Sequence, residues 1–199
     1  MHPLPSVKEL IDNVPFTGVL LDQFGVLHDG RKPYPGALEA VRSLHAAGKR
    51  IAIVSNSSRR AQGALGKIAK MGFREEWFAG VVTSGELTHR ALAERRSSGV
   101  PLWQALGDRC IWCTWSGRGG VSLDGTGVTA TLDPRRADFV LAQGTEALGS
   151  TEEGPETREA SMEELLSVLR TCAAAKLPMV VANPDIGEPK TQRQRQRGQ

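Results

Sequence analysis

A carboxylate stands directly after a short apolar run near the start of the chain. Asp22 follows the run Gly18-Val19-Leu20-Leu21, which is typical of a strand buried on both faces of a parallel sheet. A carboxylate just past such a strand lies at the mouth of the sheet, where open α/β folds bind ligands. Gly25 lets the backbone turn sharply, and Val26-Leu27 can begin a flap over the site. An ordinary turn containing aspartate is the competing interpretation, and it is more common for such a segment alone.

A run of hydroxyl and amide side chains follows the next apolar segment. Ser55-Asn56-Ser57-Ser58 comes directly after a strand predicted over 50–54 and before a helix predicted to end at Gly72. Small polar residues in this position cap a helix, because their oxygens accept its first free N–H groups. The N-terminus of a helix also binds anions, so capping and ligand binding are both compatible with this run.

Strands and helices alternate over residues 17–96, which predicts an α/β fold with a parallel sheet and crossover helices. Strands are expected at 18–21, 50–54 and 80–82, and the third is followed by a helix over about 85–96. Each apolar run is short and ends in polar residues. The pattern therefore indicates three strand-then-helix units in the first half of the chain.

The second half of the chain has a different pattern of predicted strands, loops and helices. Short strands are expected at 109–114, 139–142 and 178–182, and a helix over 161–175 is marked by Ser161 with Glu164 three residues later. Residues 149–159 are acidic and almost without apolar side chains, which predicts an exposed loop or a disordered insert.

The composition is that of an ordinary globular protein. The 199 residues are 40% apolar and 24% charged, which allows one full domain or two small ones. The apolar runs are shorter than the ~20 residues of a membrane-spanning helix, so a membrane span is excluded. The net charge of +3 comes from the last ten residues, which hold Lys190, Arg193, Arg195 and Arg197 and no acid. The rest of the chain gives no electrostatic argument for specific nucleic-acid binding.

The cysteines and the N-terminal sequence are informative about the cellular compartment. Cys110, Cys113 and Cys172 are too few for a disulfide framework, and Cys110-Ile-Trp-Cys113 without a second pair favours buried thiols over a metal site. The first residues have neither the pattern of a secretory signal nor that of a transit peptide. We therefore expect a cytoplasmic protein.

Five segments that follow one another along the chain resemble motifs of the haloacid dehalogenase superfamily. Within the superfamily they resemble the nitrophenylphosphatase-like class IIA, and in particular a hypothetical branch of that class. In chain order they are Asp22-Gln-Phe-Gly-Val-Leu, Asp29-Gly-x-x-Pro-x-Pro-Gly-Ala37, Ile53-Val-Ser-Asn-Ser-Ser58, Thr83-Ser-Gly-Glu86 and Ala182-Asn-Pro-Asp185. The resemblance covers residues 17–187. It implies a partial Rossmann-like core of three parallel β-α units at 17–98, after an N-terminal segment at 1–16. An incomplete α/β cap of the C2 type at 99–187 and a disordered basic tail at 188–199 would follow.

The resemblance also implies a chemistry. Asp22 would attack phosphorus and form an aspartyl-phosphate, with Mg²⁺ held by Asp22 and the main-chain carbonyl of Phe24. Ser55 would donate its hydroxyl to the phosphoryl group. The remaining contacts to phosphate or substrate would come from the loops and from the cap segment, at Gly25, Asn56, Ser57, Asn183 and Asp185. The substrate would be a small phosphorylated metabolite, and relatives associate into homo-oligomers through the cap.

Two departures from the pattern bear on activity. Phe24 stands where the superfamily has a second aspartate, and a phenyl ring transfers no protons, which typically costs ~10²–10⁴ in rate. Asp29 is near enough in sequence to be a candidate substitute acid. The Gly-Lys-Pro lysine and the late metal-binding acids of relatives are missing, and residues 188–199 match nothing in the pattern.

These departures suggest a truncated form whose phosphate-ester hydrolysis is impaired. The alternative is a catalytically inert isoform, or a binding or regulatory protein that retains the fold. The strand ending at Asp22 would then lie at an exposed edge, and we expect the 199-residue product to be marginally stable or insoluble.

Overall fold

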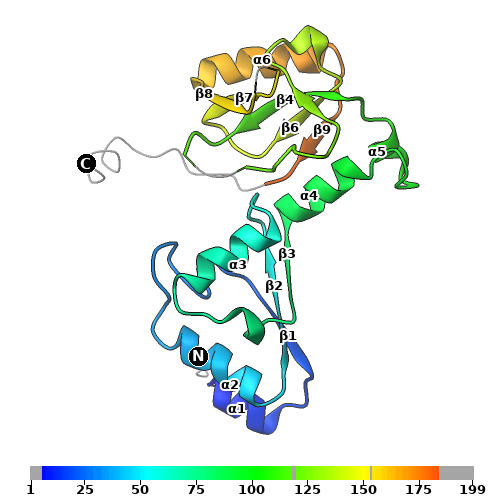
Figure 1. Ribbon diagram of the computed structural model, residues 1–199. Coiled ribbons are helices and arrows are strands. Elements are labelled where there is room, and N and C mark those ends of the chain that lie inside the picture. The colour runs from blue at the N-terminus through cyan, green and yellow to red at the C-terminus, as the bar shows by residue number, and fades with distance from the viewer. Residues whose placement is uncertain (1–5, 118–119, 153, 184–199) are drawn as a thin grey trace, which may run out of the picture.

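The computed structural model describes residues 6–117, 120–152 and 154–183. Asp185 and the predicted tail at 188–199 lie outside the described residues. The described chain forms two lobes, each built on its own sheet, with helix α4 (Ser84–Ala93) running from one to the other (Figure 1).

The first lobe confirms the predicted α/β units. Strands β1 (Gly18–Leu21), β2 (Arg50–Ser55) and β3 (Gly80–Thr83) form a parallel sheet in the order β1-β2-β3. Leu21 pairs with Ile53, and Ser55 pairs with Thr83. The carboxyl ends of all three strands therefore lie at the same edge of the sheet.

One face of this sheet is covered by helices. Helices α1 (Val7–Asn13), α2 (Ala37–Ala46) and α3 (Ala61–Ala69), with a 3₁₀ turn at Glu75–Trp77, complete the lobe. Its core joins β2 to these helices through a cluster whose most buried members are Ile51, Ile53, Val41 and Ile68. Helix α1 was not expected from the sequence, although Ser6 and Glu9 form a reciprocal capping box at its start.

The other face of the sheet is apolar and exposed. Leu20 on β1 is 75% exposed, and Val54 and Val82 on the neighbouring strands are 45% and 42% exposed. The prediction that β1 is buried on both faces is therefore wrong for the described chain, because the helices of this lobe pack against the opposite face. Strand β1 also lies at the edge of the sheet, as expected for the strand that ends at Asp22.

The second lobe is a mixed sheet with the order β8-β7-β4-β6-β9. Its strands are β4 (Arg109–Thr114), β5 (Thr129–Ala130), β6 (Phe139–Ala142), β7 (Ala147–Ser150), β8 (Glu156–Glu159) and β9 (Met179–Val181). Strands β4, β6 and β9 are parallel, β5 pairs beside β4, and β7 and β8 are antiparallel. Helix α6 (Met162–Ala174) begins after Ser161, whose hydroxyl accepts the Glu164 N–H at 3.1 Å, as predicted.

The expected loop over 149–159 is wrong in part, because its ends belong to the hairpin of β7 and β8. Gly149 lies on β7 opposite Trp112, and a β-carbon on it would come within 2.1 Å of that ring. All four residues of β8 are exposed. A charged edge strand of this kind protects a sheet from pairing with other chains, and its polarity makes it look like a loop in sequence.

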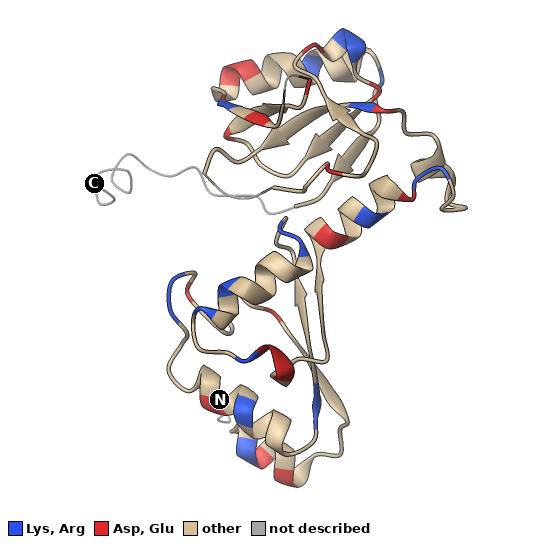
Figure 2. Cartoon of the chain, viewed as in Figure 1, with Lys and Arg blue, Asp and Glu red and all other residues tan. Residues whose placement is uncertain are grey.

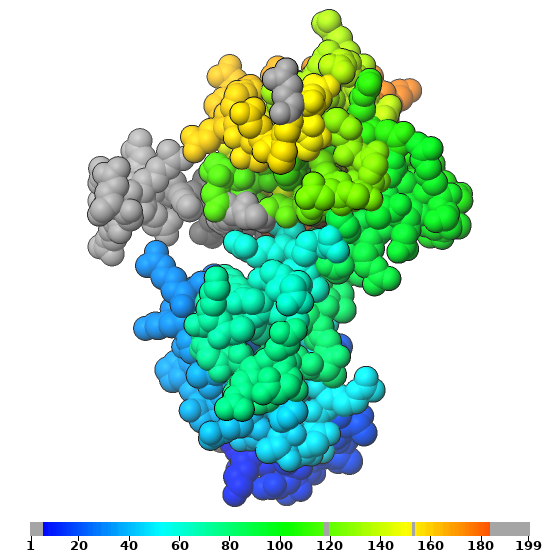
Figure 3. All heavy atoms as spheres, viewed as in Figure 1, coloured from blue at the N-terminus to red at the C-terminus, as the bar shows by residue number. Residues whose placement is uncertain are grey.

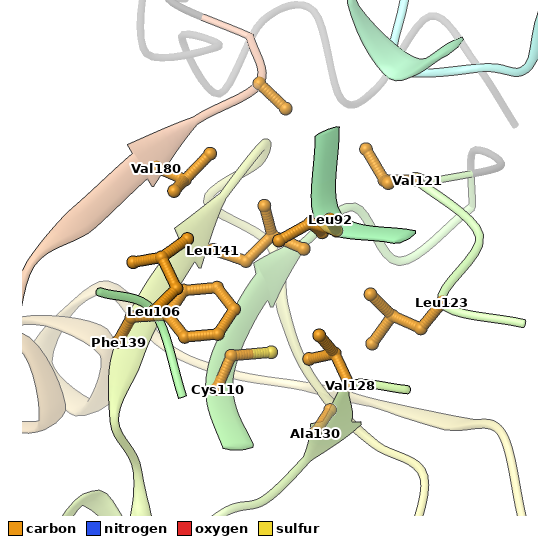
Figure 4. Packing of buried hydrophobic residues seen from close by; sticks show 11 residues of the cluster. Leu92, Leu106, Cys110, Val121, Leu123, Val128, Ala130, Phe139, Leu141 and Val180 are labelled. Carbon is orange, nitrogen blue, oxygen red and sulfur yellow. The ribbon is translucent and has the colours of Figure 1, made fainter. Parts of the chain in front are cut away.

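Helix α4 links the two lobes. It begins directly after β3, and near its end Leu92 lies fully buried in the core of the second lobe. Figure 4 shows Leu92 among side chains from β4, β6 and β9, including Cys110, Leu141 and Val180. The short helix α5 (Pro101–Gln104) and a 3₁₀ turn at Pro134–Arg136 complete the described elements.

Candidate active site

Asp22 and Ser55 lie at the carboxyl edge of the first sheet. Asp22 is one residue beyond the Leu21–Ile53 pair, and Ser55 is the last residue of the neighbouring strand β2. Asp22 is exposed, and its Oδ1 accepts the N–H of Gln23 at 2.6 Å. In the space-filling view, the cyan atoms of the segment after β2 lie where the two lobes meet (Figure 3). A carboxylate and a hydroxyl thus lie at the same edge of the sheet.

The loop after Asp22 is a compact turn built on one carbonyl. The Gln23 oxygen accepts the N–H groups of Val26, Leu27 and His28, at 2.8–3.3 Å. Gly25 has φ +84°, a conformation that strongly favours glycine. Leu27 is buried in the core of the first lobe, so it anchors the loop, while Val26 is exposed and available for the predicted flap.

Phe24 presents its ring to solvent and leaves its carbonyl available. The side chain is 68% exposed and meets the ring of His28 edge-on, with centroids 6.3 Å apart. Within this described loop, the main-chain hydrogen bonds use the carbonyls of Gln23 and His28 and not that of Phe24. The residue therefore offers an oxygen ligand two positions after Asp22, but no proton donor.

Asp29 is tied into the local turn. Its Oδ1 accepts the N–H groups of Arg31 at 2.9 Å and Lys32 at 2.8 Å. These hydrogen bonds lower the pKa of the carboxyl below its usual value, so it is ionised at neutral pH. Its role as a substitute acid stays a prediction, and this environment favours a turn-capping carboxylate over a proton donor.

Gln23 was not singled out from the sequence, whereas His28 was a candidate substrate contact because it lies near Asp22 along the chain; both side chains are buried. His28 is 2% and Gln23 5% exposed. His28 Nδ1 accepts the Gly30 N–H at 2.9 Å, which places the proton of the neutral ring on Nε2. Burial, and then the positive charge of Lys67, lower the pKa of His28, so the ring is neutral at pH 7. Neither residue lies on a periodic apolar pattern in the sequence.

The segment 55–60, here called the hydroxyl loop, leads into the N-terminus of α3. The N–H of Ser57 points at Ser55 and donates to its Oγ at 3.3 Å. Arg60 is the N-cap residue of α3, and its side chain makes no capping hydrogen bond. The run therefore does not supply a side-chain cap for α3, which was one of its two expected roles, and the Ser57 N–H instead faces the hydroxyl of Ser55.

The donor set at this edge fits Mg²⁺ in part. Mg²⁺ takes oxygen ligands, keeps several waters, and is commonly bound by one or two carboxylates together with substrate phosphate. Asp22 and the Phe24 carbonyl are such oxygens. Among the described residues there is no group of three or more Asp, Glu, His or Cys side chains suited to a metal ion. These two ligands would therefore hold the ion only together with water and phosphate.

The cap segment of the prediction is described only at its start. Asn183 lies two residues beyond the end of β9, and Asp185 lies outside the described residues. Acidic and basic residues are interspersed along the elements of both lobes (Figure 2). No helix within the described ranges has the length and apolar character needed to cross a membrane.

Cys110, Cys113 and Cys172 are buried free thiols, as expected. Burial raises the pKa of Cys110 to about 12 and that of Cys113 to about 11. Thiols of this kind are protonated at neutral pH and unreactive.

The family described as haloacid dehalogenase-like hydrolase matches residues 19–127, more than half of the chain and the whole of this edge of the sheet. The chain belongs to that haloacid dehalogenase-like hydrolase family. The match covers β1 to β3 with Asp22 and Ser55, and it continues into the second lobe. Family membership confirms the predicted fold class, a partial Rossmann-like core with a partial α/β cap.

Individual relatives agree with this assignment. A haloacid dehalogenase-like hydrolase from Brucella suis 1330 superposes with a TM-score of 0.67 at 25% identity, covering 92% of this chain and 62% of its own. A p-nitrophenyl phosphatase from Archaeoglobus fulgidus shares the fold, with a TM-score of 0.55 at 22% identity over 85% of this chain and 56% of its own.

Among curated proteins, chronophin from Rattus norvegicus is 41% identical over 80 residues, which are 38% of this chain and 26% of chronophin. Human chronophin is 39% identical over 80 residues, 38% of this chain and 27% of its own. The chain therefore matches about a quarter of the length of these curated relatives.

Proposed function

We propose that this family member carries the phosphoryl-accepting half of a phosphate-ester hydrolase that acts on a small phosphorylated metabolite. The observation that carries the proposal is the placement of Asp22 and Ser55 at the carboxyl ends of adjacent parallel strands, beside the Ser57 N–H of the loop that leads into α3. Open α/β sheets bind ligands at this edge. A carboxylate with hydroxyl and N–H donors next to it suits a tetrahedral anion.

In this proposal Asp22 is the nucleophile. One of its carboxylate oxygens attacks phosphorus, the ester oxygen leaves, and water later hydrolyses the aspartyl-phosphate. Ser55 donates its hydroxyl to a phosphoryl oxygen, and the N–H groups near Asn56 and Ser57 add further donors. Gly25 lets the backbone of the 22–28 loop turn close to the substrate. Mg²⁺, when bound by Asp22 and the Phe24 carbonyl, would reduce the repulsion between carboxylate and phosphate.

Proton transfer is the weak step of this site. The ring of Phe24 cannot protonate the leaving oxygen, and the lowered pKa of Asp29 makes that carboxyl a poor donor. Esters with good leaving groups need little protonation, so they are the substrates that this chain would cleave fastest. The activity is therefore expected to be impaired toward ordinary alkyl phosphates.

A non-catalytic role is the second candidate. The described residues hold no cluster of three metal-binding side chains, and Phe24 replaces a proton-transferring group. A chain with these features could bind a phosphorylated ligand without turning it over, as a binding or regulatory protein. Turnover measured beside ligand binding separates the two candidates.

The remaining proposals concern the organisation of the molecule. We place the core at residues 17–98 and the cap at 99–187, with association of copies through the cap and a cytoplasmic location. Leu92 belongs to α4 within the proposed core range but packs in the core of the second lobe, so the end of this helix already contributes to the second lobe before the proposed boundary is reached.

The experiment that tests the proposed function uses beryllium fluoride with MgCl₂, which mimics a phosphoryl group on a carboxylate. Saturable binding is expected for the wild type and not for Asp22→Asn, while Asp12→Asn on the exposed face of α1 serves as the matched control. Equal binding by wild type and Asp22→Asn would refute Asp22 as the phosphoryl acceptor.

A further inference from the structure

The hydroxyl loop is held by a second segment that the mechanism above does not use. Residues Thr83-Ser84-Gly85-Glu86, here called the brace, join β3 to α4 and contact the loop at nearly every residue. Resting on the proposed function, we infer that the brace positions the phosphate-binding N–H groups of the hydroxyl loop, with Ser84 as its central positioning residue.

The brace binds the carbonyl side of the loop. Ser84 Oγ donates to the carbonyl oxygens of Asn56 at 2.8 Å and Ser57 at 3.1 Å, and the Gly85 N–H donates to Ser57 at 3.0 Å. Thr83, fully buried, donates its hydroxyl to the Arg59 carbonyl at 2.6 Å. Three of four consecutive loop carbonyls therefore point toward β3 and α4.

The direction of these carbonyls fixes the direction of the N–H groups. In a trans peptide the N–H of one residue points opposite to the carbonyl of the residue before it. Since the Asn56 and Ser57 carbonyls face the brace, the N–H groups of Ser57 and Ser58 face away from it. The Ser57 N–H indeed points at Ser55 Oγ. Successive N–H groups that point the same way form an anion-binding concavity, and here it opens beside the proposed phosphate ligand.

Close packing and an ion pair reinforce this arrangement. A β-carbon on Gly85 would come within 2.0 Å of the Ser58 carbonyl oxygen, so the brace approaches the loop backbone as closely as glycine allows. Glu86 accepts two hydrogen bonds from Arg60, at 2.6 and 3.0 Å, and one from the Ala61 N–H at 3.2 Å. Its contact with Arg60 lowers the pKa of Glu86 to about 2, so the ion pair persists throughout the neutral range.

The brace is also the first turn of the helix that enters the other lobe. Farther along α4, His89 contacts the Ser122 carbonyl at 2.7 Å through Nδ1, and Leu92 is buried in the second core. One continuous helix thus connects the second lobe with the loop that carries the N–H groups. The hydroxyl loop is thus held by residues of β3 and α4, and not only by β2 and α3, which it connects. A substitution at Ser84 therefore changes the support of the loop without removing a group that is proposed to touch phosphate.

The test compares Ser84→Ala with Ser84→Thr, which keeps the hydroxyl, and with the control Ser97→Ala. Ser97 is exposed beyond α4 and likewise donates one hydrogen bond to a carbonyl, that of Glu94 at 3.1 Å. For each protein we would measure amide hydrogen exchange at Ser57 and Ser58, the affinity for orthophosphate with MgCl₂, and kcat and KM for p-nitrophenyl phosphate. Glu86→Gln provides a second perturbation at the other end of the brace if Ser84→Ala folds poorly.

Ser84→Ala is expected to speed exchange at Ser57 and Ser58 and to weaken orthophosphate binding about tenfold, because the hydrogen bond that the Ser84 hydroxyl shares between the Asn56 and Ser57 carbonyls is lost. KM should rise more than kcat falls, and Ser84→Thr should restore most of the loss. If Ser84→Ala matches Ser97→Ala in both exchange and affinity, the inference is wrong. If the wild type binds no orthophosphate, the proposed function fails, and the exchange rates alone decide whether the brace orders the loop.

Discussion

Replacing Phe24 by aspartate would restore a proton-transferring group at the position where this chain has a phenyl ring. The replacement removes little packing, because the ring is 68% exposed and its main contact is the edge-on ring of His28. An aromatic pair of this kind is worth about 0.5–1.5 kcal/mol, a small part of the roughly 5–15 kcal/mol that stabilises a typical domain. The Phe24→Asp chain should therefore fold.

The expected gain is large and depends on the substrate. General acid–base catalysis contributes ~10²–10⁴ in rate, and the contribution is largest when the leaving group is a poor one. We expect Phe24→Asp to raise kcat toward an alkyl phosphate by about this factor and to raise kcat toward p-nitrophenyl phosphate much less. The proposed metal ligand at this position is the main-chain carbonyl, so the dependence of the rate on Mg²⁺ should be the same in the variant.

The assay is steady-state phosphate release from both substrates, with Phe24→Asn as the matched control. Asparagine has nearly the shape of aspartate but does not transfer a proton. The reasoning would be refuted if the aspartate and asparagine variants had the same rates, or if the gain were equal for good and poor leaving groups. Either result would mean that proton transfer at this position does not limit the reaction.

Three further predictions concern stability and solubility. Since the folded chain lowers the pKa of His28, the unfolded chain binds that proton more tightly, so the free energy of unfolding should fall as pH decreases below about 6.5. The melting temperature of His28→Gln should lack this part of the pH dependence. The same dependence of melting temperature on pH in His28→Gln and in the wild type would contradict the prediction. Leu92→Ala leaves a cavity at a fully buried position of the second core and should cost about 2–5 kcal/mol in urea unfolding, whereas a loss below about 1 kcal/mol would show that α4 is not packed there. Leu20→Lys, at a 75% exposed position on the edge strand, should change the free energy of unfolding by less than about 0.5 kcal/mol and should reduce light scattering from aggregates. A wild-type chain that is a soluble monomer with a sharp cooperative melt would contradict the expected marginal solubility.

The parts of the structure that were predictable are those encoded by local patterns. The apolar runs that end at Asp22 and Ser55 are short, uninterrupted and followed by polar residues, so the parallel strands and the edge at which they end could be inferred. The start of α6 was equally clear, because the Ser161 cap is a local signal. Local periodicity and capping were enough to fix these elements.

The features that were missed depend on contacts between distant segments. Strand β8 is entirely polar, and only its pairing with β7 makes it a strand. The ion pair of Arg60 with Glu86 spans 26 positions, and no periodic pattern connects its members. Leu20 was expected to be buried because its strand is apolar throughout, but burial depends on what covers the sheet, which the strand's own sequence does not specify.

The proposed hydrolysis depends above all on transfer of the phosphoryl group to Asp22. This transfer is tested most directly by incubating the chain with p-nitrophenyl phosphate and MgCl₂, quenching in acid, reducing with borohydride and mapping the peptides by mass spectrometry. Borohydride converts an aspartyl-phosphate to homoserine, so the account predicts homoserine at position 22 and none in Asp22→Asn. Turnover of the substrate with unmodified Asp22, or with the label on another carboxylate, would contradict it.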